Sequence, residues 1–80
     1  MEYVIRNWSE NSSDLEYAGV EFSSIYIMVT VGEVNLTVNG MTFPIRAGEQ
    51  FDEGFIRPSA FTIDITSGVG TWRGYIRGIK

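Results

Sequence analysis

The chain has 80 residues, a net charge of −4, no cysteine and no histidine. This length suits one small domain, and we expect residues 1–80 to form it. Hydrophobic residues make up 44% and charged residues 20%, the balance of a globular protein. The absence of cysteine excludes disulfides and thiolate zinc ligands, and the absence of histidine removes the commonest general base and metal ligand. We therefore expect no enzyme activity and no cofactor.

The charges are unevenly distributed along the chain. Residues 1–56 carry nine acids against two bases, whereas residues 57–80 carry four bases against one acid. The acidic net charge argues against nucleic-acid binding, and no apolar run approaches the length of a membrane span. A disulfide-free chain this short builds a core of marginal stability. Association between copies would bury more surface and would let the two oppositely charged parts pair.

The central part of the chain has the clearest pattern. Apolar residues occupy every second position in residues 25–31, 34–38 and 41–45, which is the period of a strand with one buried face. Gly32-Glu33 suits a type II′ turn, and Asn39-Gly40 is the strongest two-residue signal for a type I′ hairpin. The sequence therefore predicts a three-stranded β-meander in the middle of the chain.

The two predicted turns also fix the strand register. A two-residue turn at each place sets Val31 opposite Val34, and Val38 opposite Met41. Every apolar residue of the meander then falls on one face of the sheet. Pro44 cannot donate a backbone hydrogen bond, so we expect its strand to lie at a sheet edge.

The flanking segments read as further strands. Residues 2–8 are expected to form one, followed by a polar loop over residues 9–14, and residues 17–22 are compatible with a short strand. The Ser13–Glu16 segment has the form of a capping box, so one helical turn is possible there.

A second hairpin is predicted at the C-terminal end. Residues 61–66 and 72–77 alternate in polarity and flank a Gly-rich loop. In that pairing Asp64 lies opposite Arg73 and forms a cross-strand ion pair with it. With about seven short strands, the expected fold is all-β, a small antiparallel sandwich, roll or barrel with a central β-meander.

Arg73, Tyr75 and Arg77 form the candidate interaction site. Strand alternation places Trp72 with Ile76 in the core, so these three residues share the opposite face. Tyr and Arg are favoured anchors of protein interfaces. Because the expected Asp64 contact would occupy Arg73, Tyr75 and Arg77 are the stronger candidates for contacts between chains.

Glu49, Asp52 and Glu53 form a small acidic group. Three carboxylates are compatible with a calcium site, with an acid/base pair, or with a solvated turn. Their spacing matches no calcium loop, so we expect a solvated turn and no metal ion.

The stretch from Val34 to Phe51, VNLTVNGMTFPIRAGEQF, resembles the central hairpin of cupin domains. It contains a strand, a Gly turn, a second strand and an Ala-Gly-Glu turn that leads into the next strand. Cupin metal chemistry uses His ligands, which this chain lacks, so the resemblance does not imply that chemistry. It implies a small cupin-like or sandwich module that binds a carbohydrate or another small ligand.

The whole chain is similar in style to the small all-β cement and decoration proteins of tailed-phage heads. The shared features are short length, dense β-branched and aromatic alternation, Gly-rich turns and no catalytic residues. This resemblance implies a virion structural protein, made in the host cytoplasm, that forms a homo-oligomer such as a trimer. Its expected partners are its own copies and the major capsid or another virion protein, with no nucleic acid and no membrane. A flat apolar or aromatic patch would favour this hypothesis, and a concave polar pocket would favour the ligand-binding module.

Overall fold

Eight β-strands make up most of residues 1–79, which are the residues that the computed structural model describes. The strands are β1 (Glu2–Asn11), β2 (Leu15–Ala18), β3 (Ser24–Val31), β4 (Glu33–Val38), β5 (Met41–Arg46), β6 (Gln50–Gly54), β7 (Ala60–Ile65) and β8 (Thr71–Ile79). Lys80, which was counted with the basic end of the sequence, lies outside the described residues. Over residues 1–79 no helix has the length and apolar character needed to cross a bilayer.

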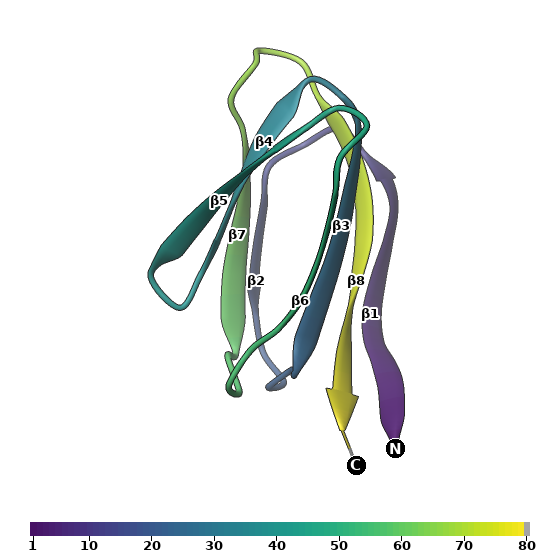
Figure 1. The fold of residues 1–80 in the computed structure, drawn as a ribbon, viewed down its shortest axis with the longest axis vertical. Helices are drawn as coiled ribbons and strands as arrows, with labels where there is room; N and C mark the ends of the chain where they lie inside the picture. The colour runs from purple at the N-terminus through teal and green to yellow at the C-terminus, as the bar shows by residue number, and fades with distance from the viewer. Residues whose placement is uncertain (80) are drawn as a thin grey trace.

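The strands form two antiparallel sheets that face each other (Figure 1). The terminal sheet has the order β1-β8-β3-β6 and contains both ends of the described chain, and the hairpin sheet has the order β2-β7-β4-β5. The predicted all-β sandwich class is confirmed, with eight strands in place of about seven.

The core lies between the two sheets and is apolar. The inward residues of β3 and β8 meet those of β4 and β7, and all of these side chains are fully buried: Ile25, Ile27, Val29, Trp72, Ile76, Val34, Leu36 and Ile63. Trp8, Tyr17 and Phe61 add an aromatic cluster in which neighbouring ring centroids lie 5.4 to 5.9 Å apart. Trp72 is therefore a core residue, as its position in the alternation predicted.

The β4–β5 hairpin has the predicted turn and register. Asn39 and Gly40 have φ angles of 53° and 75°, as a type I′ turn requires. Val38 lies opposite Met41, and Pro44 lies on β5 at an edge of the hairpin sheet. This part of the prediction is confirmed because the turn chemistry and the apolar alternation specify the same register.

The other half of the predicted meander is wrong. β3 pairs with β8 and β6 in the terminal sheet, whereas β4 pairs with β5 and β7 in the hairpin sheet. At Gly32, with φ of 75°, the chain passes from one sheet to the other, so Val31 does not lie opposite Val34. Strand alternation predicts the same buried face whether β3 and β4 pair in one sheet or lie in opposite sheets, because both sheets bury that face in one core.

The predicted C-terminal hairpin is wrong for the same reason. β7 belongs to the hairpin sheet and β8 to the terminal sheet, so residues 66–70 also cross between the sheets. Asp64 lies opposite Asn35, and it does not face Arg73. Strand alternation alone does not distinguish a loop that turns back within one sheet from a loop that crosses to the opposite sheet.

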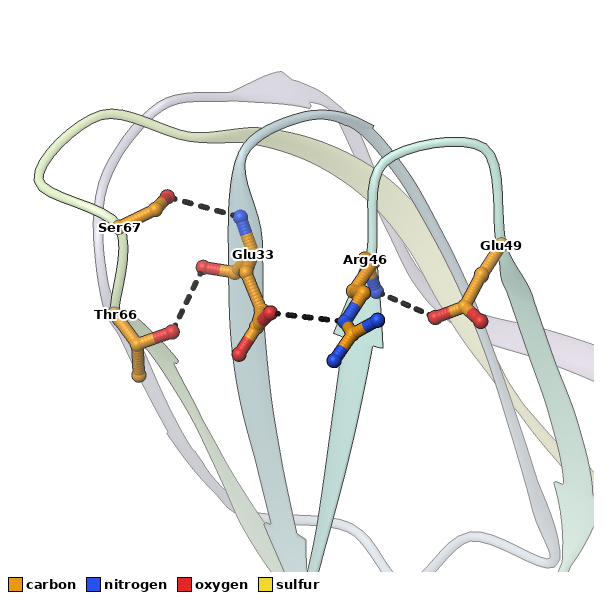
Figure 2. A network of polar contacts seen from close by, with 5 residues as sticks. All are labelled: Glu33, Arg46, Glu49, Thr66 and Ser67. Carbon is orange, nitrogen blue, oxygen red and sulfur yellow. Dashed lines mark hydrogen bonds and ion pairs between the residues drawn. The ribbon is translucent and has the colours of Figure 1, made fainter.

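The β3–β4 and β7–β8 crossings pack against each other at one end of the sandwich (Figure 2). The Glu33 N–H donates to Ser67 Oγ at 2.9 Å, and Thr66 Oγ1 donates to the Glu33 carbonyl oxygen at 3.2 Å. The Glu33 carboxylate accepts from Arg46 Nε at 3.3 Å. These contacts join the β3–β4 and β7–β8 connections to the end of β5.

The N-terminal part differs from the prediction at its loop. β1 continues to Asn11, so the first half of the expected polar loop is strand. The helical turn that the Ser13–Glu16 capping box allowed is absent, and β2 begins at Leu15 instead. The Asp14 carboxylate accepts from the Ile65 N–H at 2.8 Å, which ties this connection to the end of β7.

Candidate functional site on the outer face of the terminal sheet

The outer face of the terminal sheet carries the predicted interaction residues. On β8, Trp72 and Ile76 are fully buried, while Arg73, Tyr75 and Arg77 alternate with them and point away from the core. The predicted face is therefore confirmed for all three residues. Their role at an interface stays a prediction.

Tyr75 stacks on Tyr26 of β3. The two residues lie directly opposite each other in the β3–β8 pairing, with ring centroids 5.0 Å apart and 25° between the ring planes. Tyr26 was not among the predicted site residues. Its outward position follows from alternation along β3, but its neighbour depends on the β3–β8 pairing, which was not predicted.

Arg77 is held in place within the chain. Its Nε donates to Ser24 Oγ at 2.8 Å, and its Nη2 donates to the Asp52 carboxylate at 2.8 Å. The Glu2 carboxylate lies 4.0 Å from Nε, and the guanidinium carbon lies 5.4 Å from the Tyr75 ring centroid. The charge of Arg77 is thus neutralised by its own chain, which makes it a positioning residue of this face.

Arg73 is exposed and forms no ion pair with any residue in 1–79. Its guanidinium donates to Met28 Sδ at 3.2 Å, a weak acceptor. The expected Asp64 contact is wrong, because Asp64 lies in the other sheet. The expected preference for Arg77 over Arg73 depended on that contact, and the observed contacts leave Arg73, and not Arg77, open to another chain.

A shallow hollow of about 680 Å³ lies on this face, over β8. Residues of β1, among them Val4 and Asn7, line it on one side, and Tyr26 of β3 lines it on the other. Arg73 and Tyr75 of β8 complete the lining. The hollow therefore combines aromatic rings with amide and guanidinium groups.

Glu10 also lines the hollow, and an irregularity of β1 places it there. The register of β1 against β8 shifts between Trp8 and Asn11, as in a β-bulge. Within this shift Glu10 has a φ of 23°, in the left-handed region that non-glycine residues seldom adopt. The sequence carried no signal for the bulge, and Glu10 was not among the predicted site residues.

The acidic residues at 49–53 have separate structural roles. Glu49 Oε1 accepts from the Arg46 N–H at 2.7 Å and closes the turn after β5 (Figure 2). Asp52 and Glu53 lie in β6, so the expected solvated turn is wrong for them. Asp52 holds Arg77 on the outer face. Among residues 1–79, no three carboxylates lie close enough together to hold a metal ion.

A second exposed surface lies at the end of the sandwich where β1 begins and β8 ends (Figure 1). Ile56 and Ile79 are 91% and 68% exposed and share a hollow with Phe22 and Phe55. Ile79 follows Arg77 on the outward side of β8. The outward row of this strand therefore ends in exposed apolar surface.

Comparisons with known proteins bear on the fold. No family model and no curated protein matches the chain. Among solved structures, it is similar to the Cnp3 cupin domain of Schizosaccharomyces pombe, with a TM-score of 0.62 and 16% sequence identity. The alignment covers 89% of this chain and 52% of that one, so the chain spans about half the length of that structure. The fold of this chain is therefore cupin-like, as the Val34–Phe51 segment suggested.

Proposed function

We propose that this chain is a non-catalytic structural protein that acts through protein–protein contacts as a homo-oligomer. The contact surface is the outer face of the terminal sheet. The observation that carries the proposal is the stacked Tyr26–Tyr75 pair beside Arg73 on that face.

The chemistry of these residues suits a protein contact. Tyr and Arg are enriched among interface residues with large binding contributions. Stacking restrains the rings of Tyr26 and Tyr75 in the free chain, so little side-chain entropy remains to be lost on binding. Arg73 has no carboxylate partner within residues 1–79, and a carboxylate on another chain would supply a charge-assisted hydrogen bond.

The exposed isoleucines support the same proposal. Apolar side chains such as Ile56 and Ile79 are hydrated in the single chain, and covering them on association is favourable. A chain of 80 residues without disulfides gains proportionately more from such burial than a large domain does.

A placement on a virus particle, in contact with the major capsid protein or another virion protein, belongs to the same proposal. It rests on the resemblance in style to phage cement and decoration proteins. Cosedimentation of the purified chain with phage heads that lack it tests this placement. Capsid or portal genes beside its own gene would support it.

The hollow itself favours a second candidate function, the binding of a carbohydrate or another small ligand. Its volume of about 680 Å³ falls in the range of ligand sites, and Tyr75, Asn7 and Arg73 offer ring and polar contacts. Saturation-transfer NMR against a panel of oligosaccharides tests this candidate. Binding that is lost in Asn7→Ala, in a chain that stays monomeric, would place it ahead of assembly.

Sedimentation equilibrium over micromolar to millimolar concentration tests the proposed assembly. We expect wild type to form a defined oligomer and Tyr75→Ala to weaken its association at least about tenfold, which is about 1.4 kcal/mol. Thr62→Ala, on the hairpin sheet, is the matched control and should associate as wild type does. A wild-type chain that stays monomeric at millimolar concentration, with no virion partner that binds it, would refute the proposal.

A further inference from the structure

We infer that two copies meet face to face about a two-fold axis, with Arg73 of each copy against Glu10 of the other. This inference rests on the proposed function and specifies the partner and the symmetry of the contact. It follows from the charges and from the shape of the outer face of the terminal sheet.

Among residues 1–79, one cation and one anion on this face, Arg73 and Glu10, have no ionic partner. Arg77 is neutralised by Asp52 at 2.8 Å, with Glu2 at 4.0 Å. Arg73 and Glu10 are both exposed, and neither forms an ion pair or a hydrogen bond with a charged group in residues 1–79. Both line the same hollow.

A surface that carries both signs of charge is complementary to itself. About a two-fold axis each patch meets an identical patch, so a residue pair that forms once forms twice. Two Arg73–Glu10 contacts would then join the copies. A head-to-tail arrangement would instead set Arg73 against a carboxylate on another surface, such as exposed Glu16 of the hairpin sheet.

The position of Glu10 is built into the strand. The register shift in β1 and the left-handed φ of 23° hold Glu10 beside the hollow, where a regular strand would continue its ladder with β8. Bulges of this kind redirect side chains near functional surfaces. A conformation that is unfavourable for glutamate thus places an unpaired carboxylate within the reach of a second chain.

The shape of the face is also suited to a two-fold contact. The stacked rings of Tyr26 and Tyr75 form one wall of the hollow, which lies over β8 and is bordered by β1. In a two-fold contact over this face, the aromatic wall of each copy lies against the hollow of the other. Each copy then buries its rings and covers the hollow of its partner.

Charge reversal tests the pairing directly. In Arg73→Glu or Glu10→Arg, two like-charged pairs replace two attractive ones, and we expect the dissociation constant of the dimer to rise at least about tenfold. The double variant Arg73→Glu/Glu10→Arg restores opposite charges and should associate within about threefold of wild type. The two single variants mixed together should also form a heterodimer. Sedimentation equilibrium gives the mass and the constant in each case.

Matched controls come from the hairpin sheet. Arg46→Glu and Glu16→Arg make the same changes in net charge at exposed positions and should leave association unchanged. Circular dichroism melts of all variants show whether each is folded, and Arg73→Gln and Glu10→Gln repeat the test without reversed charge.

The outcomes separate this inference from the proposed function. Suppose that wild type is a dimer but that neither single reversal raises the dissociation constant, or that the double variant fails to restore it. Either result overturns the two-fold pairing, while the proposed assembly stands. A wild-type trimer or larger ring also overturns the pairing. A wild-type chain that is monomeric at millimolar concentration overturns the proposed function and the pairing with it.

Discussion

Arg77 and Asp52 form an ion pair across an intervening strand. Arg77 lies on β8 and Asp52 on β6, with β3 between them, yet Nη2 lies 2.8 Å from the carboxylate. The side chain crosses β3 beside Ser24, whose Oγ accepts from Nε at 2.8 Å. One arginine thus links three strands of the terminal sheet and holds the edge strand β6 in place.

Asp52→Asn is expected to lower the free energy of unfolding by about 1 kcal/mol. The substitution keeps the shape of the side chain but removes the charge that faces Arg77. The loss stays moderate because the Asp52 side chain is 54% exposed and water screens the pair. Urea denaturation measures the change. Glu53→Gln, on the same strand, is the control, and an equal loss in both variants would contradict a specific role for Asp52.

Gly40→Val is expected to lower the free energy of unfolding by about 2 kcal/mol, because a β-branched residue is strained at a φ of 75°. A Cβ at this position meets no atom within 4 Å, so the cost comes from the backbone conformation and not from a clash. Gly40→Asn should lower the free energy of unfolding much less, since Asn tolerates the left-handed region. Thermal melts of the two variants provide the comparison, and equal melting temperatures would argue against the type I′ turn.

Gly74→Ala is expected to destabilise the protein by about 3 kcal/mol, which is a large part of the stability of a domain this small. A Cβ on Gly74 would run into the Tyr26 carbonyl oxygen on the neighbouring strand β3. Gly54→Ala is the control, because the nearest atom to its Cβ would be the Ser23 carbonyl oxygen at an ordinary 3.5 Å. Urea denaturation followed by circular dichroism should separate the two variants, and similar midpoints would refute the β3–β8 register.

Trp72→Phe is expected to lower the free energy of unfolding by about 2 kcal/mol. The change removes the hydrogen bond that Nε1 donates to the Ser13 carbonyl oxygen at 3.1 Å and leaves a space in the fully buried core. Trp8→Phe provides the comparison, because Trp8 is only half-buried and should lose less. Far-UV circular dichroism melts measure both, and a smaller loss at Trp72 than at Trp8 would contradict the assigned burial.

The sequence predicted those features that depend on neighbours along the chain. The β4–β5 hairpin followed from Asn39-Gly40 and the apolar alternation around it, because a type I′ turn fixes the register of the strands that it joins. Alternation also assigned Trp72 to the core and Tyr75 to the outer face. In both cases the information lay within a few residues of the feature.

The features that were missed depend on contacts between distant segments. The position of β3 in one sheet and β4 in the other is decided by the pairing of β3 with β8. That pairing brings Tyr26 to Tyr75 and separates Asp64 from Arg73. The bulge at Glu10 likewise arises between β1 and β8. The contact of Tyr26 with Tyr75 and the position of Glu10 therefore could not be predicted from local pattern.

The pairing of β1 with β8 also sets an order of events during folding. Glu2 lies opposite Ile79, so β1 cannot form its hydrogen bonds with β8 until β8 has been synthesised and has left the ribosome. The β4–β5 hairpin needs no distant partner and can form much earlier. Until β8 arrives between β1 and β3, their edges and the apolar faces of the terminal sheet are open to other chains. The nascent chain thus passes through a stage in which it is most exposed to aggregation, and the closing strand ends that stage.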